Sequence, residues 1–330
     1  FLKGGDLVFI IPPFQRNYEW GKTQCEELFD DIKSISDDRK KRHYLGNVVY
    51  YGKKRSRTNG YEYILVDGQQ RITTILILLC ALRDCDVNKE IQSDIFVDYL
   101  ENKIQKNEFK TKLKQTEYDQ DDFSALVLQS DSINEENNVY KNFEYFKERI
   151  KETVKESNIS MVDLFDSLDR LNLVEIDLEI EDDLEAVQKI FEKINSTGKP
   201  LTTGDLIRNF LLLSKDLTEQ EDLYKNYWLK IENNILSKNV SVFAKDYLVM
   251  KIFEDVKDSE VYKKFKQVFG EDSNIKEKIL KDMTKYSEYY SWILEPNTLL
   301  STQNRKKEVI KKYQNQVEKA LIISVIFLNQ

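Results

Sequence analysis

Glycine and proline are scarce in this chain, and that scarcity limits the possible folds more than any other feature of the sequence. Only 10 glycines and 4 prolines occur among 330 residues, which disfavours collagen-like, linker-rich and turn-dense all-β architectures. Hydrophobic residues make up 41% of the chain, enough to build a real core. The composition therefore predicts an ordered protein that is rich in long helices and has a length typical of roughly two domains.

Strand patterns nevertheless interrupt the helical ones in the first two thirds of the chain. Runs of apolar, β-branched and aromatic residues predict strands at residues 7–11, 44–51, 61–66, 110–114 and 173–180. Residues 44–51 and 61–66 flank a turn-rich loop, which predicts a hairpin. We expect an α+β fold, with a small mixed sheet and helices over residues 1–215 and an all-helical domain over 216–330.

Helical periodicity accounts for most of the remaining chain. The predicted helices are residues 23–35, 72–83, 91–104, 121–129, 137–155, 161–169, 181–194 and 204–214, with further helices after residue 219. Thr23 and Glu26 have capping-box spacing, which predicts that the first helix begins there. The chain opens without Met and ends within an apolar helical pattern, so we expect it to be part of a larger protein.

The single histidine, His43, excludes several kinds of active site. A His-rich zinc site and nuclease motifs with two or more histidines are impossible, and a Ser-His-Asp triad would have to use His43. We interpret His43 as a structural histidine.

The three cysteines, Cys25, Cys80 and Cys85, are too few for an all-Cys zinc site. They suggest reduced thiols and a cytoplasmic protein, with Cys80 in the core. Neither apolar run, at residues 72–82 or 320–328, has the ~20 residues needed to span a membrane.

The turn at Asp67-Gly-Gln-Gln-Arg71 is the first candidate site, because it follows a predicted strand and precedes a predicted helix. The first turn of a helix presents free N–H groups and positive potential, which suits phosphate. Gly68 permits an unusual backbone angle and a close approach of a ligand to the backbone. Arg71 can clamp phosphate oxygens, and Asp67 can hold Mg²⁺ or orient a water. The alternative is a simple turn in which Arg71 makes an ion pair. The pattern is not a Walker A loop.

A second candidate site is the loop at residues 11–20, whose sequence is IPPFQRNYEW. Its polar side chains and aromatic rings are typical of surfaces that bind phosphates and stack bases. Aromatic residues such as Tyr18 and Trp20 also lock loops onto cores, and we favour that role for Trp20. Arg16 is the better candidate for binding.

The third candidate site spans residues 191–209 and contains the polar turn NSTGKPLTT. Asn195, Thr197 and Gly198 can contact a ligand in this turn. Asp205 lies at a helix start, where an acidic residue is favourable whatever the function. Asp205 and Arg208 are three residues apart and can simply pair on the helix surface.

A basic run between the predicted hairpin strands can contact a nucleic-acid backbone. Its residues are Lys53, Lys54, Arg55 and Arg57. The alternative is a solvated hairpin tip. The whole chain has 50 basic and 58 acidic residues and a net charge of −8, so indiscriminate binding of nucleic acid is not expected.

The three candidate segments, in this order, resemble the N-terminal domain family of GmrSD-type, modification-dependent restriction systems. The motifs that carry the resemblance are IPPFQRNYEW at residues 11–20, VDGQQRITT at residues 66–74 and the segment F-x-x-I-N to D-L-I-R-N at residues 191–209. The segment HYLG at residues 43–46 also matches. The resemblance covers about residues 1–215.

The resemblance implies a ParB/sulfiredoxin-like core that binds and hydrolyses a nucleoside triphosphate with Mg²⁺ at the D-G-Q-Q-R turn. In that family the activity regulates a DNA-cleaving module in defence against phage, often an HNH-type nuclease. One histidine cannot supply such a motif. The nuclease module is therefore expected elsewhere, in cis or in trans.

The resemblance also assigns roles to individual residues. The implied catalytic residues are Asp67, Gln70 and Arg71, with Asp67 holding metal or water, Gln70 positioning the attacking water and Arg71 stabilising phosphate charge. The implied nucleotide contacts are Gln15, Arg16, Gly68, Gln69, Thr73, Asn195, Thr197, Gly198, Asp205 and Arg208. Asn209 also matches the third motif.

Two other hypotheses stay open. The domain can instead read DNA, including modified DNA, through Lys53–Arg57 and the aromatic loop without hydrolysing anything. It can also be a scaffold in which the three motifs only hold the fold.

Overall fold

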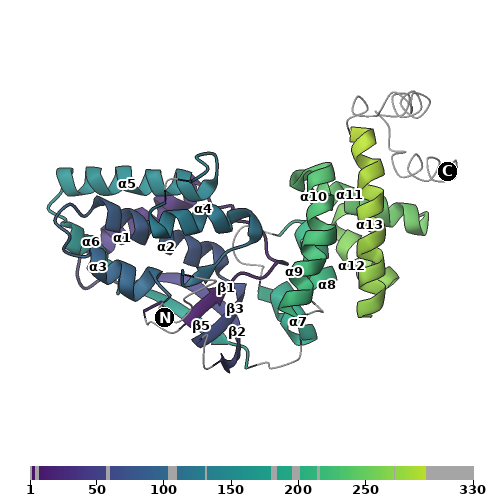
Figure 1. The fold of residues 1–330 in the computed structure, drawn as a ribbon, viewed down its shortest axis with the longest axis horizontal. Helices are drawn as coiled ribbons and strands as arrows, with labels where there is room; N and C mark the ends of the chain where they lie inside the picture. The colour runs from purple at the N-terminus through teal and green to yellow at the C-terminus, as the bar shows by residue number, and fades with distance from the viewer. Residues whose placement is uncertain are drawn as a thin grey trace. The chain divides into compact units, whose positions relative to one another are not determined.

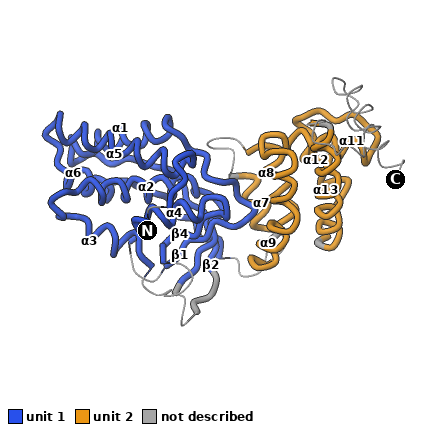
Figure 2. The backbone as a smooth tube through the Cα atoms, turned by 45° about the horizontal axis from the view of Figure 1, so that its top comes forward, with its two compact units in different colours: residues 1–183 blue, residues 184–330 orange. Residues whose placement is uncertain are grey.

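The computed structural model describes residues 2–3, 7–56, 60–102, 110–130, 132–179, 184–194, 201–213, 216–270 and 272–294. At residues 53–56, 60, 184, 185, 194, 273 and 293 it describes the backbone alone. The chain divides into two compact units, Phe1–Asp183 and Leu184–Gln330 (Figure 2). The predicted domains, 1–215 and 216–330, were drawn from motifs and strand content, and that division stays a prediction.

The first unit contains all of the strands among the described residues. Its elements are β1 (Leu7–Ile10), α1 (Lys22–Asp37), β2 (His43–Ser56), β3 (Gly60–Asp67), α2 (Gln69–Cys85), α3 (Gln92–Ile95), the π-helical segment η1 (Phe96–Leu100), β4 (Leu113–Lys114), α4 (Glu117–Leu128), α5 (Asn138–Glu156), α6 (Met161–Leu168) and β5 (Leu171–Asp177). The strands form one sheet in the order β4-β1-β3-β2-β5. The predicted hairpin is the antiparallel pair β2–β3, whereas β1–β3, β1–β4 and β2–β5 are parallel. The sheet is therefore mixed, and the predicted α+β class is confirmed.

Helices cover one face of the sheet and supply most of the core of this unit (Figure 1). The sheet side chains Phe9, Tyr50 and Leu65 belong to the same buried cluster as residues of α1, α2 and α5. Helix α2 is apolar around almost its whole circumference and is buried along most of its length, as expected of a central helix. Burial of α2 fixes the position of its first turn relative to β2 and β3.

Several element boundaries differ from the predictions. Helix α1 begins two residues earlier than the Thr23–Glu26 capping box implied, because its N-cap is Gly21, whose N–H donates to Gln24 Oε1 at 3.0 Å. The helix predicted over residues 91–104 ends at Leu100. Beyond it, Glu101 pairs with Thr111 in an isolated bridge.

The described elements of the second unit are all helical, and they are joined by short non-helical connections. Its elements are α7 (Leu184–Ile194), α8 (Thr203–Leu212), α9 (Leu217–Leu223), η2 (Tyr224–Trp228), α10 (Leu229–Ile235), η3 (Ser237–Asn239), α11 (Val240–Ile252), η4 (Asp258–Glu260), α12 (Val261–Phe269) and α13 (Ser273–Leu294). The helical character predicted after residue 219 is confirmed as far as Leu294. None of the described helices combines the length and apolar character that crossing a membrane requires.

Candidate functional site

The turn between β3 and α2 is shaped by a glycine. Strand β3 ends at Asp67, and Gly68 has φ of +92° immediately before α2 begins. A Cβ atom at Gly68 would lie 3.0 Å from the Asn47 carbonyl oxygen and 3.0 Å from Val48 Cγ2. Only glycine satisfies both the backbone angle and this approach to β2. The start of α2 is thereby held against β2, with its positive end at the turn.

The Arg71 side chain packs against strand β2. Arg71 Nη1 donates to the Asn47 carbonyl oxygen at 2.6 Å. Gly46 has φ of +118°, and a Cβ atom there would lie 2.9 Å from both Cζ and Nε of Arg71. The guanidinium therefore lies directly against glycine backbone. This contact gives a physical reason for the glycine of the HYLG segment.

The Asp67 carboxylate lies where two positive charges act on it. Burial raises the pKa of Asp67, while the positive charges of Arg71 and Arg16 and a hydrogen bond from the Gly68 N–H lower it. Arg16 Nη1 also pairs with Glu19 Oε2 at 3.3 Å. The structure therefore brings together Asp67, Arg71 and Arg16, three of the predicted site residues. We call this group the charged corner.

The loop at residues 11–20 is tied to this corner by two buried glutamines. Gln15 Nε2 donates to the Val66 carbonyl oxygen at 2.7 Å, at the end of β3. Gln70 Oε1 accepts from the Glu19 N–H at 2.8 Å and from the Trp20 N–H at 3.2 Å. These bonds hold the Arg16 segment of the loop beside the first turn of α2.

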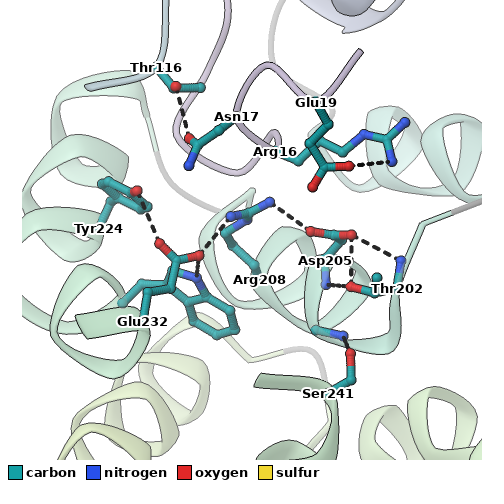
Figure 3. A network of polar contacts seen from close by, with 12 residues as sticks. Arg16, Asn17, Glu19, Thr116, Thr202, Asp205, Arg208, Tyr224, Glu232 and Ser241 are labelled. Atoms are coloured by element: carbon teal, nitrogen blue, oxygen red, sulfur yellow. Dashed lines mark hydrogen bonds and ion pairs between the residues drawn. The ribbon is translucent and has the colours of Figure 1, made fainter. Parts of the chain in front are cut away.

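Gln70 makes one further bond to the same loop, since its Nε2 donates to the Asn17 carbonyl oxygen at 3.0 Å. The Asn17 side chain in turn accepts from Thr116 Oγ1 at 2.9 Å (Figure 3). Both functional atoms of the Gln70 amide are therefore engaged with the loop. The structure shows Gln70 as a loop anchor, and its predicted role in positioning a water stays untested.

Tyr18 locks the loop onto the helices. Its hydroxyl lies 2.7 Å from Thr74 Oγ1 and accepts from Asn142 Nδ2 at 2.9 Å, and its N–H donates to Asp119 Oδ2 at 2.7 Å. Trp20, the aromatic residue favoured for this role from the sequence, is partly buried and packs against the same core. The loop is therefore held by α2, α4 and α5 together.

Two other residues of the motif at residues 66–74 are buried. Thr73 is 1% exposed, and its Oγ1 accepts from Gln115 Nε2 at 2.9 Å, so its hydroxyl is engaged in the core. Gln69 is 6% exposed, and among the described residues no donor reaches its Oε1. A buried amide oxygen without a donor is costly. Gln69 Oε1 is thus a buried acceptor that no described group satisfies.

The third motif lies in the second unit and is described only in part. Asn195, Thr197 and Gly198 lie outside the described residues. Asp205 forms a capping box with Thr202, whose N–H and Oγ1 donate to Asp205 Oδ2 at 2.9 and 2.8 Å. Asp205 therefore lies at a helix start, as predicted. It also forms the predicted pair with Arg208, whose Nη2 donates to Asp205 Oδ1 at 2.9 Å. That pair lies on one face of α8, as predicted, and it is largely shielded from solvent.

Arg208 reaches a second carboxylate that sequence reasoning missed. Its Nη1 donates to Glu232 Oε1 at 2.9 Å, and both side chains are less than a tenth exposed (Figure 3). Glu232 also accepts from Trp228 Nε1 at 2.8 Å and from the Tyr224 hydroxyl at 3.3 Å. The available signal was the i, i+4 spacing of Trp228 and Glu232 within a helical pattern. Asn209 is fully buried, and no described residue bonds to its amide.

The remaining predicted residues give less information. The DNA-binding prediction is not tested, because the side chains of Lys53, Lys54 and Arg55 and the whole of Arg57 lie outside the described residues.

His43 Nε2 lies 3.2 Å from Asp31 Oδ2. Cys80 is fully buried as predicted, and burial raises its pKa to about 12. Within the described part of the chain, no three His, Cys, Asp or Glu side chains are grouped so as to hold a metal.

Taken together, these features define an α+β protein that carries a charged strand–turn–helix corner on a small mixed sheet. A family model described as the GmrSD restriction endonuclease, N-terminal domain, matches residues 1–212. The chain belongs to this family, and it is a component of a restriction system. The match spans all three motifs and ends at the last residue of α8. No curated protein matches the chain.

Proposed function

We propose that this chain binds and hydrolyses a nucleoside triphosphate, and that its nucleotide state controls a nuclease module of the restriction system, in cis or in trans. The observation that carries the proposal is the charged corner, in which Arg16 and Arg71 both act on Asp67 where β3 turns into α2. Family membership supports the link to a nuclease and to DNA.

Electrostatics favour a polyanion at this corner. Two guanidinium groups act there against the Asp67 carboxylate, and the N-terminus of α2 adds partial positive charge and unpaired N–H groups. A triphosphate matches this arrangement, because helix N-termini and arginines are common phosphate ligands. Arg71 and Arg16 would stabilise the charge that develops during phosphoryl transfer.

The residues of the corner also fit Mg²⁺. In nucleotide sites this ion takes one or two carboxylates and completes its shell with phosphate oxygens and water. Asp67 supplies a carboxylate whose pKa is raised by burial, and Gln69 Oε1 is a buried oxygen that lacks a donor. Asp67, with Gln69 nearby in sequence, would hold the ion. When bound, Mg²⁺ neutralises charge on the phosphates.

Several predicted contacts are reassigned in this proposal. Gln15 and Gln70 position the loop that carries Arg16, because their amides bond to backbone groups of β3 and of the loop. Thr73 supports the same corner from the core. Gly68 shapes the turn. Asp205 and Arg208 remain proposed nucleotide contacts.

The first experiment is to substitute Arg71. We expect Arg71→Ala to lower Mg²⁺-dependent phosphate release by at least about 100-fold, the usual cost of removing a group that stabilises transition-state charge. Phosphate release is measured with ATP, GTP, CTP and UTP. Arg39→Ala is the matched control, since Arg39 is 82% exposed and pairs with Asp163 at 3.0 Å. Hydrolysis by Arg71→Ala at the unsubstituted rate contradicts the catalytic assignment.

The alternative function is DNA binding, or sensing of modified DNA, without hydrolysis, and the family description is the observation that favours it. Binding through backbone phosphates weakens steeply as salt rises. A DNA titration across salt concentrations, together with a thermal-shift screen of the four triphosphates with Mg²⁺, separates the two functions. Salt-sensitive DNA binding with no thermal shift supports the alternative.

A further inference from the structure

The two edges of the sheet differ in how open they are. In the described sheet one edge is β4, which has only two residues, and the other is β5, which has seven. Short edge strands are a common protection against unwanted pairing. Strand β5 lacks that protection, and its sequence, LNLVEID, contains no proline and no lysine.

Two hydrogen bonds show which backbone groups of β5 point away from its neighbour β2, outward from the edge of the sheet. The His43 N–H donates to the Arg170 carbonyl oxygen at 3.2 Å, and the Leu178 N–H donates to the Tyr50 carbonyl oxygen at 2.9 Å. Because backbone groups alternate along a strand, the even-numbered residues between them also face β2. The N–H and C=O groups that point outward belong to Leu171, Leu173, Glu175 and Asp177. None of the described residues bonds to them.

The side chains along β5 are accessible and acidic. Val174 is 47% exposed, and Asn172, Glu175 and Asp177 are also exposed. Leu171 and Leu173 pack against the core and anchor the strand. Glu175 is held by a hydrogen bond with the Tyr50 hydroxyl. Within the described part of the chain, the edge therefore combines a firmly held strand, backbone groups that no residue pairs with, and negative charge.

We propose that β5 is a docking edge for an extended segment of a partner protein that carries lysine or arginine side chains. The segment adds a sixth strand through backbone hydrogen bonds to the outward groups of β5. Its basic side chains lie opposite Glu175 and Asp177, since opposite charges across neighbouring strands are stabilising. A second copy of this chain is a poor occupant, because it brings the same acidic strand to the edge. This proposal does not depend on the proposed hydrolysis.

The test uses the full chain and dye-labelled synthetic peptides with alternating lysine and valine. One matched peptide has glutamate in place of lysine, and another has N-methyl groups on alternate amides. We expect the basic peptide to bind and to slow amide exchange at least tenfold at Leu173 and Glu175, but not at Val174 or Ile176, which already bond to β2. The acidic peptide should not bind, and N-methylation should weaken binding at least tenfold.

A double charge reversal, Glu175→Lys with Asp177→Lys, keeps the backbone edge and should reverse the preference from the basic to the acidic peptide. The control is Glu148→Lys with Asp166→Lys, which changes the charge equally at exposed helical positions. Glu175→Pro removes one outward donor and should abolish binding of both peptides.

Three results would overturn the proposal. The first is peptide binding that is insensitive to N-methylation and to the double reversal. The second is unchanged exchange of the outward amides at saturating basic peptide. The third is a dimer of this chain that Glu175→Pro dissociates, since the occupant would then be a second copy.

Discussion

At the scale of single residues, Gly46 decides where Arg71 can lie. Alanine at Gly46 would have to adopt φ of +118° and would place its Cβ 2.9 Å from the guanidinium. We expect Gly46→Ala to lower the free energy of unfolding by about 1–3 kcal/mol and to reduce any activity that requires Arg71. Urea unfolding and phosphate release measure the two effects. Gly52→Ala, in the same strand and with ordinary contacts to Tyr63, should change neither.

Asp67 gives a pH-dependent prediction at the same scale. Burial raises its pKa, so folding favours the protonated acid over the carboxylate. The resulting stabilisation is fully present below the ordinary pKa of aspartate and is lost as pH rises through the raised pKa. We therefore expect Asp67→Asn to stabilise the nucleotide-free protein at about pH 7, and to lose that advantage at about pH 3.5. Urea unfolding at both pH values measures this. An equal effect at both, or a loss of stability at neutral pH, contradicts it.

At the scale of elements, one carboxylate joins α8 to α10. Glu232 on α10 accepts from Arg208 on α8 and from Trp228 and Tyr224 of η2. Truncation removes the shared acceptor of three buried donors, while Arg208 keeps its bond to Asp205. Glu232→Ala should therefore cost about 3–5 kcal/mol. Glu254→Ala removes an exposed partner of Lys264 and should cost less than about 1 kcal/mol. Denaturant unfolding of both variants tests this, and similar costs would contradict it.

At the scale of the whole molecule, the family motifs are distributed over the two compact units. The core cluster that includes Phe9 and α2 lies entirely within residues 1–183. Asp205 and Arg208 belong to the second unit, although the family match continues to residue 212. We expect a fragment of residues 1–183 to fold, with protected amides in α2, but to lose phosphate release. Circular dichroism, amide exchange and the phosphate assay measure this. A fragment that hydrolyses triphosphate at the full rate shows that the third motif is dispensable.

Much of the fold could be predicted because its signals are local. The runs around β1, β2, β3 and β5 have strand composition, and the apolar segment after Arg71 predicts α2. The Gly68 turn was also predictable, because glycine between a strand and a helix favours positive φ. The roles of Gln70 and Thr73 were not, since both amino-acid types serve equally well as ligands or as anchors. Their hydrogen bonds to Asn17 and Gln115 depend on which segments meet.

By itself, the sequence determined the helix-rich α+β class, the hairpin and the position of Asp67 and Arg71 around a turn, because periodicity and turn chemistry depend on residues close together in the chain. Only the tertiary structure decided that Arg71 rests on Gly46, that Arg16 acts on Asp67 and that β5 is an edge strand of the described sheet. These features join residues far apart in the chain. Strand order and burial create them, and neither can be read from spacing alone.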